Sequence, residues 1–156
     1  MSFAETTKVS PEKSRYEIEM TLKRYGAEGF AYATDGTRSM IQFKAHGRLV
    51  RFVLCMPDPA DVRFTVVVRN KQRRQRTPQQ AQLAWEQECR RVWRSLALTV
   101  KAKLEAVAAR ISVFEAEFLA NIVLPGDKLV GDVVLPEIAR AYATGKAPQL
   151  LLGSGG

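Results

Sequence analysis

Eleven of the 24 Lys and Arg residues lie between Val62 and Lys103, where only two Glu accompany them. This segment has a net charge of +9, whereas the other 114 residues, with 13 basic and 14 acidic side chains, sum to −1. The solvated surface of an ordinary soluble protein mixes positive and negative side chains. This concentration of positive charge in one segment therefore favours contact with a polyanion, and an acidic protein partner or plain solubility are the alternatives.

Eight cations of this segment are candidates for binding phosphate groups. Five of them belong to the polar run over 69–76. The other three, Arg90, Arg94 and Lys101, lie within about 40° of one another around a predicted helix, at 100° per residue. Each phosphate that they neutralise releases condensed counterions, which gives affinity without reading a base sequence. A solubilising helix face beside a flexible loop is the alternative interpretation. The candidates are Arg69, Lys71, Arg73, Arg74, Arg76, Arg90, Arg94 and Lys101.

Side chains suited to catalysis or metal binding are sparse. His46 is the only histidine, and with Cys55 and Cys89 it cannot complete a four-ligand zinc site. The chain has neither a Gly-rich phosphate loop nor a nucleophile-elbow motif. We therefore expect no catalytic residue, no metal and no cofactor, and two buried reduced cysteines.

Acidic residues leave one enzymatic alternative, a magnesium-dependent nuclease. Asp58 and Asp61 lie in a Pro-flanked segment beside the basic sequence, and Glu86 or Glu88 could complete a metal site. Carboxylates two residues apart on a helix point in different directions, which favours solvated side chains over a catalytic pair. The nuclease hypothesis therefore ranks below simple binding.

Exposed aromatic residues would allow the protein to stack on the bases of a nucleic acid, whereas without them it would contact only the phosphate backbone. Tyr32 is the candidate for base stacking, because it has a polar tip and flanks a predicted turn. We expect Trp85 and Trp93 in the core or at a subunit interface. The other strand aromatics, expected in the core, are Phe30, Phe43, Phe52 and Phe64.

The elements that must position these residues begin with a helix. Ser10 followed by Pro11 predicts its start, and Gly26 its end. Strands follow over 30–34, 40–43 and 49–55, and the last is the most apolar and is expected at the centre of the sheet. The predicted turns are Asp35-Gly36 and 45–48, and a fourth strand is expected over 62–68.

An exposed basic loop over 69–78 is expected to lead into the longest element. Apolar residues three or four apart from Trp85 to Ile111 predict one helix of about 30 residues. Ser112 with Glu115 resembles a capping box that begins a further helix. A small hairpin around 125–127 and a helix from Pro136 to Gly145 are expected to complete the chain.

Together these elements predict an α+β fold: an N-terminal helix, a three- to four-stranded antiparallel meander, a long amphipathic helix and a small C-terminal α/β appendage. We expect one domain over 10–145, a disordered segment over 1–9 and a flexible tail over 146–156. Neither a secretory signal nor a membrane-spanning run is evident, which predicts a cytoplasmic protein without membrane contact.

The stretch from Trp85 to Leu98, with Lys101 to Val107 after it, resembles a family of small uncharacterised proteins of bacteriophages and prophages. The resemblance runs from about Ser10 to Tyr142. It implies a host bacterial cytoplasm and roles such as a replication or recombination accessory, a host-takeover factor or a defence inhibitor. It transfers no activity.

The sequence thus predicts a non-enzymatic DNA-binding protein, with a slight preference for single strands over duplex. A homo-oligomer is expected, because further apolar residues continue the apolar face of the long helix. Together they make an apolar surface larger than one small sheet can cover. The alternative is a module that binds an acidic host protein and inhibits or recruits it. The residues that continue this face are Ile111, Phe114, Phe118, Ile122 and Leu124.

Overall fold

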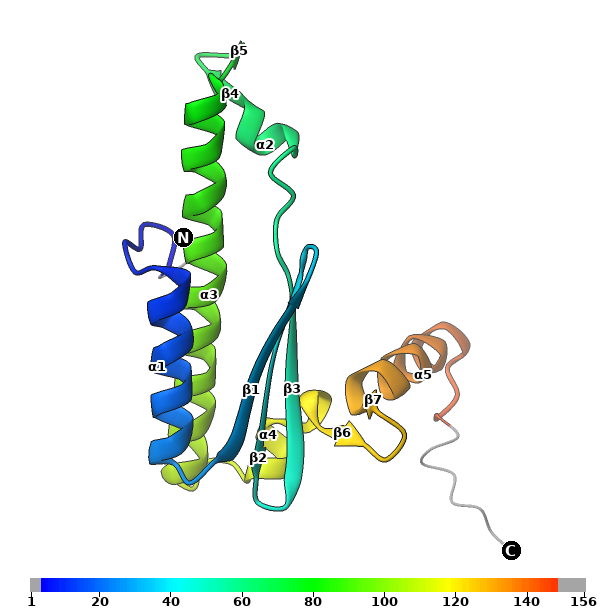
Figure 1. Cartoon of the computed structure of the whole chain (residues 1–156). Helices are drawn as coiled ribbons and strands as arrows, with labels where there is room; N and C mark the ends of the chain where they lie inside the picture. Colours follow the sequence, from blue (N-terminus) through cyan, green and yellow to red (C-terminus); the bar gives the residue numbers. More distant parts are fainter. Residues whose placement is uncertain (1–3, 149–156) are drawn as a thin grey trace, which may run out of the picture.

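A three-stranded antiparallel sheet packs against two long helices in the computed structural model, which describes residues 4–148 (Figure 1). The predicted α+β order is confirmed. The elements are α1 (Pro11–Arg24), β1 (Glu28–Asp35), β2 (Arg38–Ala45), β3 (Arg48–Cys55), α2 (Val62–Thr65), β4 (Val66–Arg69), β5 (Gln72–Gln75), α3 (Pro78–Ala108), α4 (Phe114–Glu117), η1 (Leu119–Asn121), β6 (Val123–Leu124), β7 (Lys128–Leu129) and α5 (Val130–Thr144).

Helix α1 begins and ends where its local sequence predicts. The Ser10 hydroxyl accepts a hydrogen bond from the Lys13 amide at 3.2 Å, and Pro11 occupies a position that needs no amide donor. Gly26 takes a φ of 84°, a left-handed conformation that favours glycine and ends the helix. The chain then turns directly into β1.

The sheet has the order β1-β2-β3, so β2 is central and the prediction that the third strand is central is wrong. The apolar character of β3 has another cause: the C-terminal part of the chain covers its outer edge. Val50 forms a bridge with Ile122, and the Asn121 side-chain Nδ2 donates to the Arg51 carbonyl at 3.1 Å.

The two hairpin turns of the sheet are short. His46 and Gly47 have φ values of 51° and 70°, which confirms the predicted second turn. The first turn lies one residue later than predicted. Asp35 pairs with Arg38, which leaves Gly36 and Thr37 between the strands.

Helix α3 is the longest element and confirms the prediction of one helix of about 30 residues. The Thr77 hydroxyl accepts from the Gln80 amide while the Gln80 side chain accepts from the Thr77 amide, a reciprocal cap. Its 31 residues rise about 46 Å, whereas an eight-residue strand spans only about 27 Å. The N-terminal part of α3 therefore extends beyond the sheet (Figure 1).

The core lies between one face of the sheet and the helices α1, α3 and α4. It includes Phe114, Phe118 and Ile122, three of the five residues assigned above to a subunit interface, because the chain after α3 folds back under the sheet. Ile111 is 83% exposed and Leu124 is also exposed. The other large core residues are Ile18, Leu22, Ile41, Phe43, Val50, Phe52, Trp93, Leu96, Val100 and Leu104.

The C-terminal appendage differs from its prediction in two places. Ser112 donates to the Val113 carbonyl and does not cap α4, so the predicted capping box is absent. The last helix begins at Val130 with Pro136 inside it. Gly131 permits this earlier start, because a Cβ there would lie 3.0 Å from the Ala120 carbonyl oxygen. The hairpin β6–β7 and the end at Gly145 agree with the prediction.

Segments expected to be disordered are partly described. Residues 1–3 and 149–156, with most of the predicted tail, lie outside the described residues. Ala4 is buried, and the Gln87 side chain donates to the carbonyls of Glu5 and Thr7, so 4–9 has a defined path along α3. Of the two cysteines, Cys89 is buried as predicted, but Cys55 is exposed at the end of β3.

Candidate nucleic-acid interface

The most basic part of the chain forms a hairpin at the N-terminal end of α3 (Figure 1). The predicted fourth strand over 62–68 does not join the sheet. Asp61 accepts from the Arg63 amide at 2.9 Å and caps the short helix α2, and only then does β4 begin. β4 pairs with β5, so the predicted exposed loop over 69–78 is instead half of a hairpin and the start of α3. We call 66–75 the basic tip.

The turn of the basic tip is Asn70-Lys71, with φ values of 49° and 65°. Two consecutive positive φ angles are the geometry of a type I′ turn, whose twist matches that of the flanking strands. Asn tolerates this conformation better than most residues. The valine run followed by Asn is a local signal of this hairpin, although a loop was predicted over 69–78.

Arg76 holds the base of the hairpin and is less available to a ligand than the sequence suggested. Its amide donates to the Thr65 carbonyl at 2.8 Å. Its guanidinium donates to the carbonyls of Arg63 and Phe64 at 3.1 and 3.0 Å. Arg76 thereby joins α2 to the second strand of the tip, and the contact fixes the hairpin on the end of α3.

A second set of contacts joins α2 to α3. Glu88 accepts two hydrogen bonds from Arg91, at 2.8 and 2.6 Å, and lies 3.8 Å from Arg63. The indole of Trp85 donates to the Pro57 carbonyl at 2.8 Å. These bonds connect the segment before the tip to the helix that carries it.

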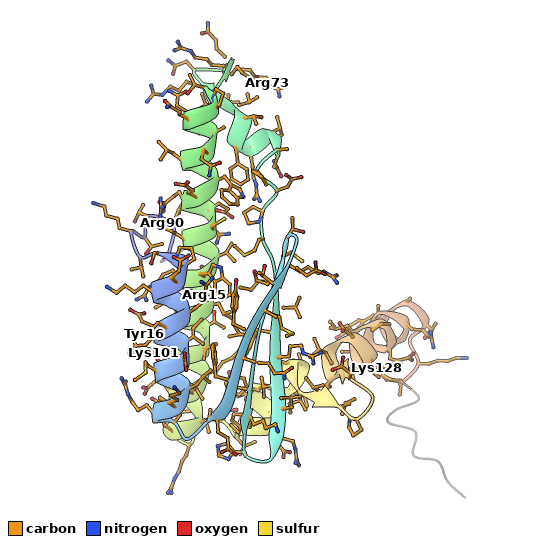
Figure 2. All side chains as sticks on the ribbon, viewed as in Figure 1. Arg15, Tyr16, Arg73, Arg90, Lys101 and Lys128 are labelled. Atoms are coloured by element: carbon orange, nitrogen blue, oxygen red, sulfur yellow. The ribbon has the colours of Figure 1, made fainter. Side chains whose placement is uncertain are left out.

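Four cations of the basic tip make no side-chain hydrogen bond or ion pair with any part of the chain that the structure describes. They are exposed, and the sequence from Val62 to Trp85 contains six cations and no acidic residue to neutralise them. Figure 2 shows Arg73 extending from the tip, away from the sheet. The four are Arg69, Lys71, Arg73 and Arg74.

One face of the tip forms a concave surface with the beginning of α3. Its volume is about 490 Å³, and β4 and β5 contribute Arg69 and Arg74 to it. Thr77 and Gln80 line it from the helix side. The N-terminal end of a helix dipole adds positive potential, so the concave surface is suited to an anion.

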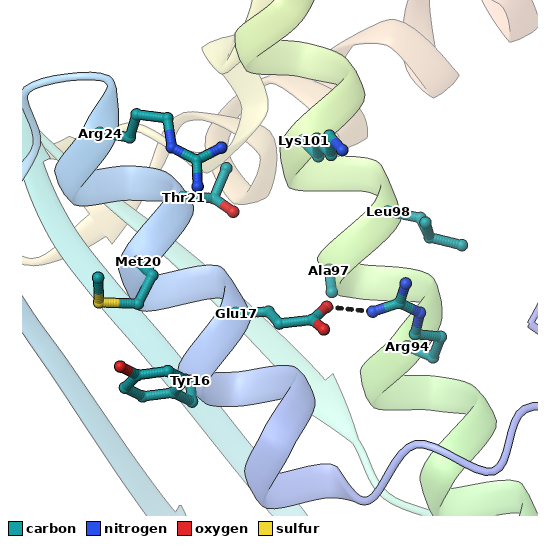
Figure 3. A pocket seen from close by; sticks show the side chains of 9 residues that line it. All are labelled: Tyr16, Glu17, Met20, Thr21, Arg24, Arg94, Ala97, Leu98 and Lys101. Carbon is teal, nitrogen blue, oxygen red and sulfur yellow. Dashed lines mark hydrogen bonds and ion pairs between the residues drawn. The ribbon is translucent and has the colours of Figure 1, made fainter.

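The three candidate cations of the α3 face do not continue this surface. Arg94 forms an ion pair with Glu17 of α1 (Figure 3). Arg90 donates to the Gln87 side chain at 3.1 and 2.7 Å. Lys101 lines a separate groove of about 360 Å³ together with Arg24. On this face the Glu17 carboxylate of α1 interrupts the predicted track at Arg94. Binding by Arg90 and Lys101 stays a prediction.

Tyr32, the candidate for base stacking, lies against Trp93 in the body of the protein. The two ring centroids are 5.7 Å apart, and the Arg15 guanidinium lies 4.3 Å from the Tyr32 ring centroid. Trp93 is about 22 Å along α3 from Pro78 at 1.5 Å per residue. Tyr32 is 39% exposed, but the structure does not bring it to the basic tip.

The carboxylates proposed for a nuclease are separated into local roles. Asp58 accepts from the Ala60 amide and Asp61 caps α2. Glu86 accepts from Gln82, and Glu88 binds Arg91. Among residues 4–148, no group of three His, Cys, Asp or Glu side chains is arranged to hold a metal ion.

The Glu88 contacts give a pH dependence to stability. The hydrogen bonds from Arg91 hold the pKa of Glu88 below its ordinary value, despite partial burial that raises it. Because the pKa of Glu88 is lower in the folded state, its ionised carboxylate stabilises the fold fully at pH values above the unfolded pKa of about 4.3. This stabilisation is lost as the pH falls through the folded-state pKa.

We therefore expect Glu88→Gln to lower the melting temperature at pH 6 and the difference from wild type to shrink by pH 3. Circular dichroism melts at both pH values measure this. Glu86→Gln, whose partner is the neutral Gln82, is the matched control. An equal Glu88→Gln effect at both pH values would contradict the assignment.

Comparisons of the chain with protein-family models, with curated proteins and with solved structures found no match. The resemblance to small phage proteins therefore stays a prediction. Among the described helices, none is both long and apolar enough to cross a bilayer.

Proposed function

We propose that this protein binds DNA without acting on it chemically, and that the basic tip is its binding surface. The observation that supports this most directly is the set of four unpaired cations on a hairpin whose sequence holds no acidic residue. Such a surface has no partner within the described chain. A phosphate backbone supplies the missing charge at regular spacing, largely independently of base sequence.

The position of the tip supports the same proposal. It stands at the end of α3 and is held there by Arg76 and Glu88, so a long ligand can reach it without meeting the sheet (Figure 2). Of the eight candidate cations, the four unpaired tip residues then supply most of the binding energy. Arg76 positions them. Arg94, paired with Glu17, contributes little.

Salt dependence tests the proposal. Four phosphate contacts predict a slope of log affinity against log salt of about −3 to −4. Affinity for a labelled oligonucleotide should therefore fall roughly 50- to 150-fold between about 50 and 200 mM salt. Fluorescence anisotropy measures this directly. Absence of binding at the lower salt with micromolar protein would contradict the proposal, as would cleavage of the DNA with added magnesium.

A protein partner is the second candidate, and one observation favours it. Val62 of α2, Val68 of β4 and Leu83 of α3 are 56%, 64% and 62% exposed. Apolar side chains among arginines are typical of protein interfaces. An acidic protein on this surface would bind with defined stoichiometry, and truncating Val68 and Leu83 to alanine would weaken it. The same truncations leave DNA binding nearly unchanged if phosphates are the ligand.

A further inference from the structure

We propose that the basic tip enters the major groove of B-form duplex DNA, and that duplex is preferred to single strands and to duplex RNA. This rests on the proposed function and names its substrate class. It reverses the slight preference for single strands that the sequence suggested. The two faces of the hairpin both carry cations.

The pairing register places cations on both faces of the ribbon. Residues directly opposite each other in an antiparallel pair project to the same side. Val68 opposes Arg73, and Val67 opposes Arg74. Arg73 therefore lies on one face, and Arg74 shares the other face with Arg69.

Lys71 lies in the turn, between these two faces. A groove has a phosphate wall on each side, so it can use all of these charges at once. A single strand has one backbone and can contact only one face.

The dimensions of the basic tip also fit the major groove of duplex DNA. Two strands about 4.8 Å apart, joined by the two-residue turn Asn70-Lys71, form a narrow projection. The B-form major groove, about 12 Å wide, admits a two-stranded β-ribbon. The deep and narrow major groove of A-form RNA does not admit side chains in this way.

The basic tip lacks the aromatic side chains on which the bases of a single strand would stack. Single-strand binding proteins gain about 1–3 kcal/mol per base from aromatic stacking. Residues 66–77 contain no aromatic residue. Phe64 is buried in α2, and Tyr32 packs against Trp93 in the protein body. What remains at the tip is charge and the hydrogen-bonding side chains of Gln72 and Gln75, which suit phosphates and base edges.

Competition between three ligands tests the substrate class. The full-length protein, bound to a labelled DNA duplex of about 24 base pairs, is titrated with unlabelled duplex DNA, duplex RNA of the same sequence, and one DNA strand. We expect duplex DNA to compete at least about tenfold better than either alternative. Equal or better competition by the single strand or by RNA would overturn the inference and leave the proposed DNA binding intact. No binding of any of the three would overturn both.

Two single substitutions test the two-faced contact. Arg73→Gln and Arg74→Gln remove one charge each, from opposite faces, and both side chains lack bonds that folding requires. We expect each to lower duplex affinity by several-fold and to reduce the salt slope by about 0.9. An effect confined to one of the two would show that only one face meets DNA and would contradict groove entry.

Chemical probing locates the groove. Dimethyl sulfate methylates guanine N7 in the major groove and adenine N3 in the minor groove. With duplex saturated by protein, we expect N7 to be protected, and protection to be lost with Arg73→Gln/Arg74→Gln. Protection of adenine N3 alone would place the tip in the minor groove and overturn the assignment.

Discussion

Reversing the charge of Arg73 and Arg74 to glutamate is expected to lower DNA affinity on the order of 100-fold at about 0.1 M salt. Two phosphate contacts are lost, and two carboxylates then face the backbone. The salt slope should become shallower by about 2. Anisotropy titrations at several salt concentrations give both quantities. The fold should persist, because both side chains are exposed and make no hydrogen bond or ion pair within the described chain.

The control for this experiment is Arg24→Glu/Lys101→Glu. Each reversal removes two charges, so both double variants have a net charge of +4 in place of +8. Arg24 and Lys101 are also exposed and line the separate α1–α3 groove (Figure 3). Lys101 is about 35 Å along α3 from Pro78, several times the Debye length of about 8 Å at physiological salt. DNA affinity should therefore change little. An equal loss in both variants would show that net charge, and not the tip, determines binding.

Replacing Phe118 with alanine is expected to destabilise the protein by about 3–5 kcal/mol. The ring is fully buried and meets three others: Phe43, Phe52 and Phe114, with centroids 6.0, 6.2 and 4.8 Å away. Truncation leaves a cavity where the segment after α3 joins the sheet. For a chain of this length the loss corresponds to a fall in melting temperature of roughly 6–20 °C.

The neighbouring substitution Leu119→Ala is the matched control for Phe118→Ala. Leu119 is 54% exposed and should contribute less than about 1 kcal/mol. Chemical denaturation of the two variants measures the difference. If Phe118 instead faced a partner subunit, as its sequence position suggested, Phe118→Ala would change the oligomeric state at constant monomer stability. That result would contradict its placement in the core.

The helices could be predicted closely because their signals are local. Ser10-Pro11 places a capping hydroxyl before a residue that needs no amide partner, and the structure uses it. Thr77-Pro78 is the same kind of signal at the start of α3, although the prediction did not use it. Apolar spacing along α3 identified its buried face for the same reason. Where two local signals competed, the prediction was wrong. Pro136 predicts a helix start, but the space left by Gly131 beside Ala120 allows α5 to begin six residues earlier.

The central strand of the sheet was misassigned because apolar composition reports burial and not strand order. β3 is apolar since Ile122 and Asn121 cover its edge, and they lie about 70 residues away along the chain. The hairpin of the basic tip was missed for a different reason. Its second strand is made of Gln and Arg, which have no strong strand preference, and pairing with Val66–Arg69 decides its conformation.

The concentration of charge, the absence of aromatic residues from 66–77 and the positions of α1 and α3 follow from the order of residues along the chain. Which cations are available depends on how distant segments pack. Arg94 and Glu17 are 77 residues apart, and their pairing depends on the packing of α1 beside α3. Arg76 is engaged with the carbonyls of Arg63 and Phe64, whereas Arg73 and Arg74 have no partner in the described chain. Charge is a property of each residue, but its neutralisation depends on distance, and distance between remote residues is set by the fold.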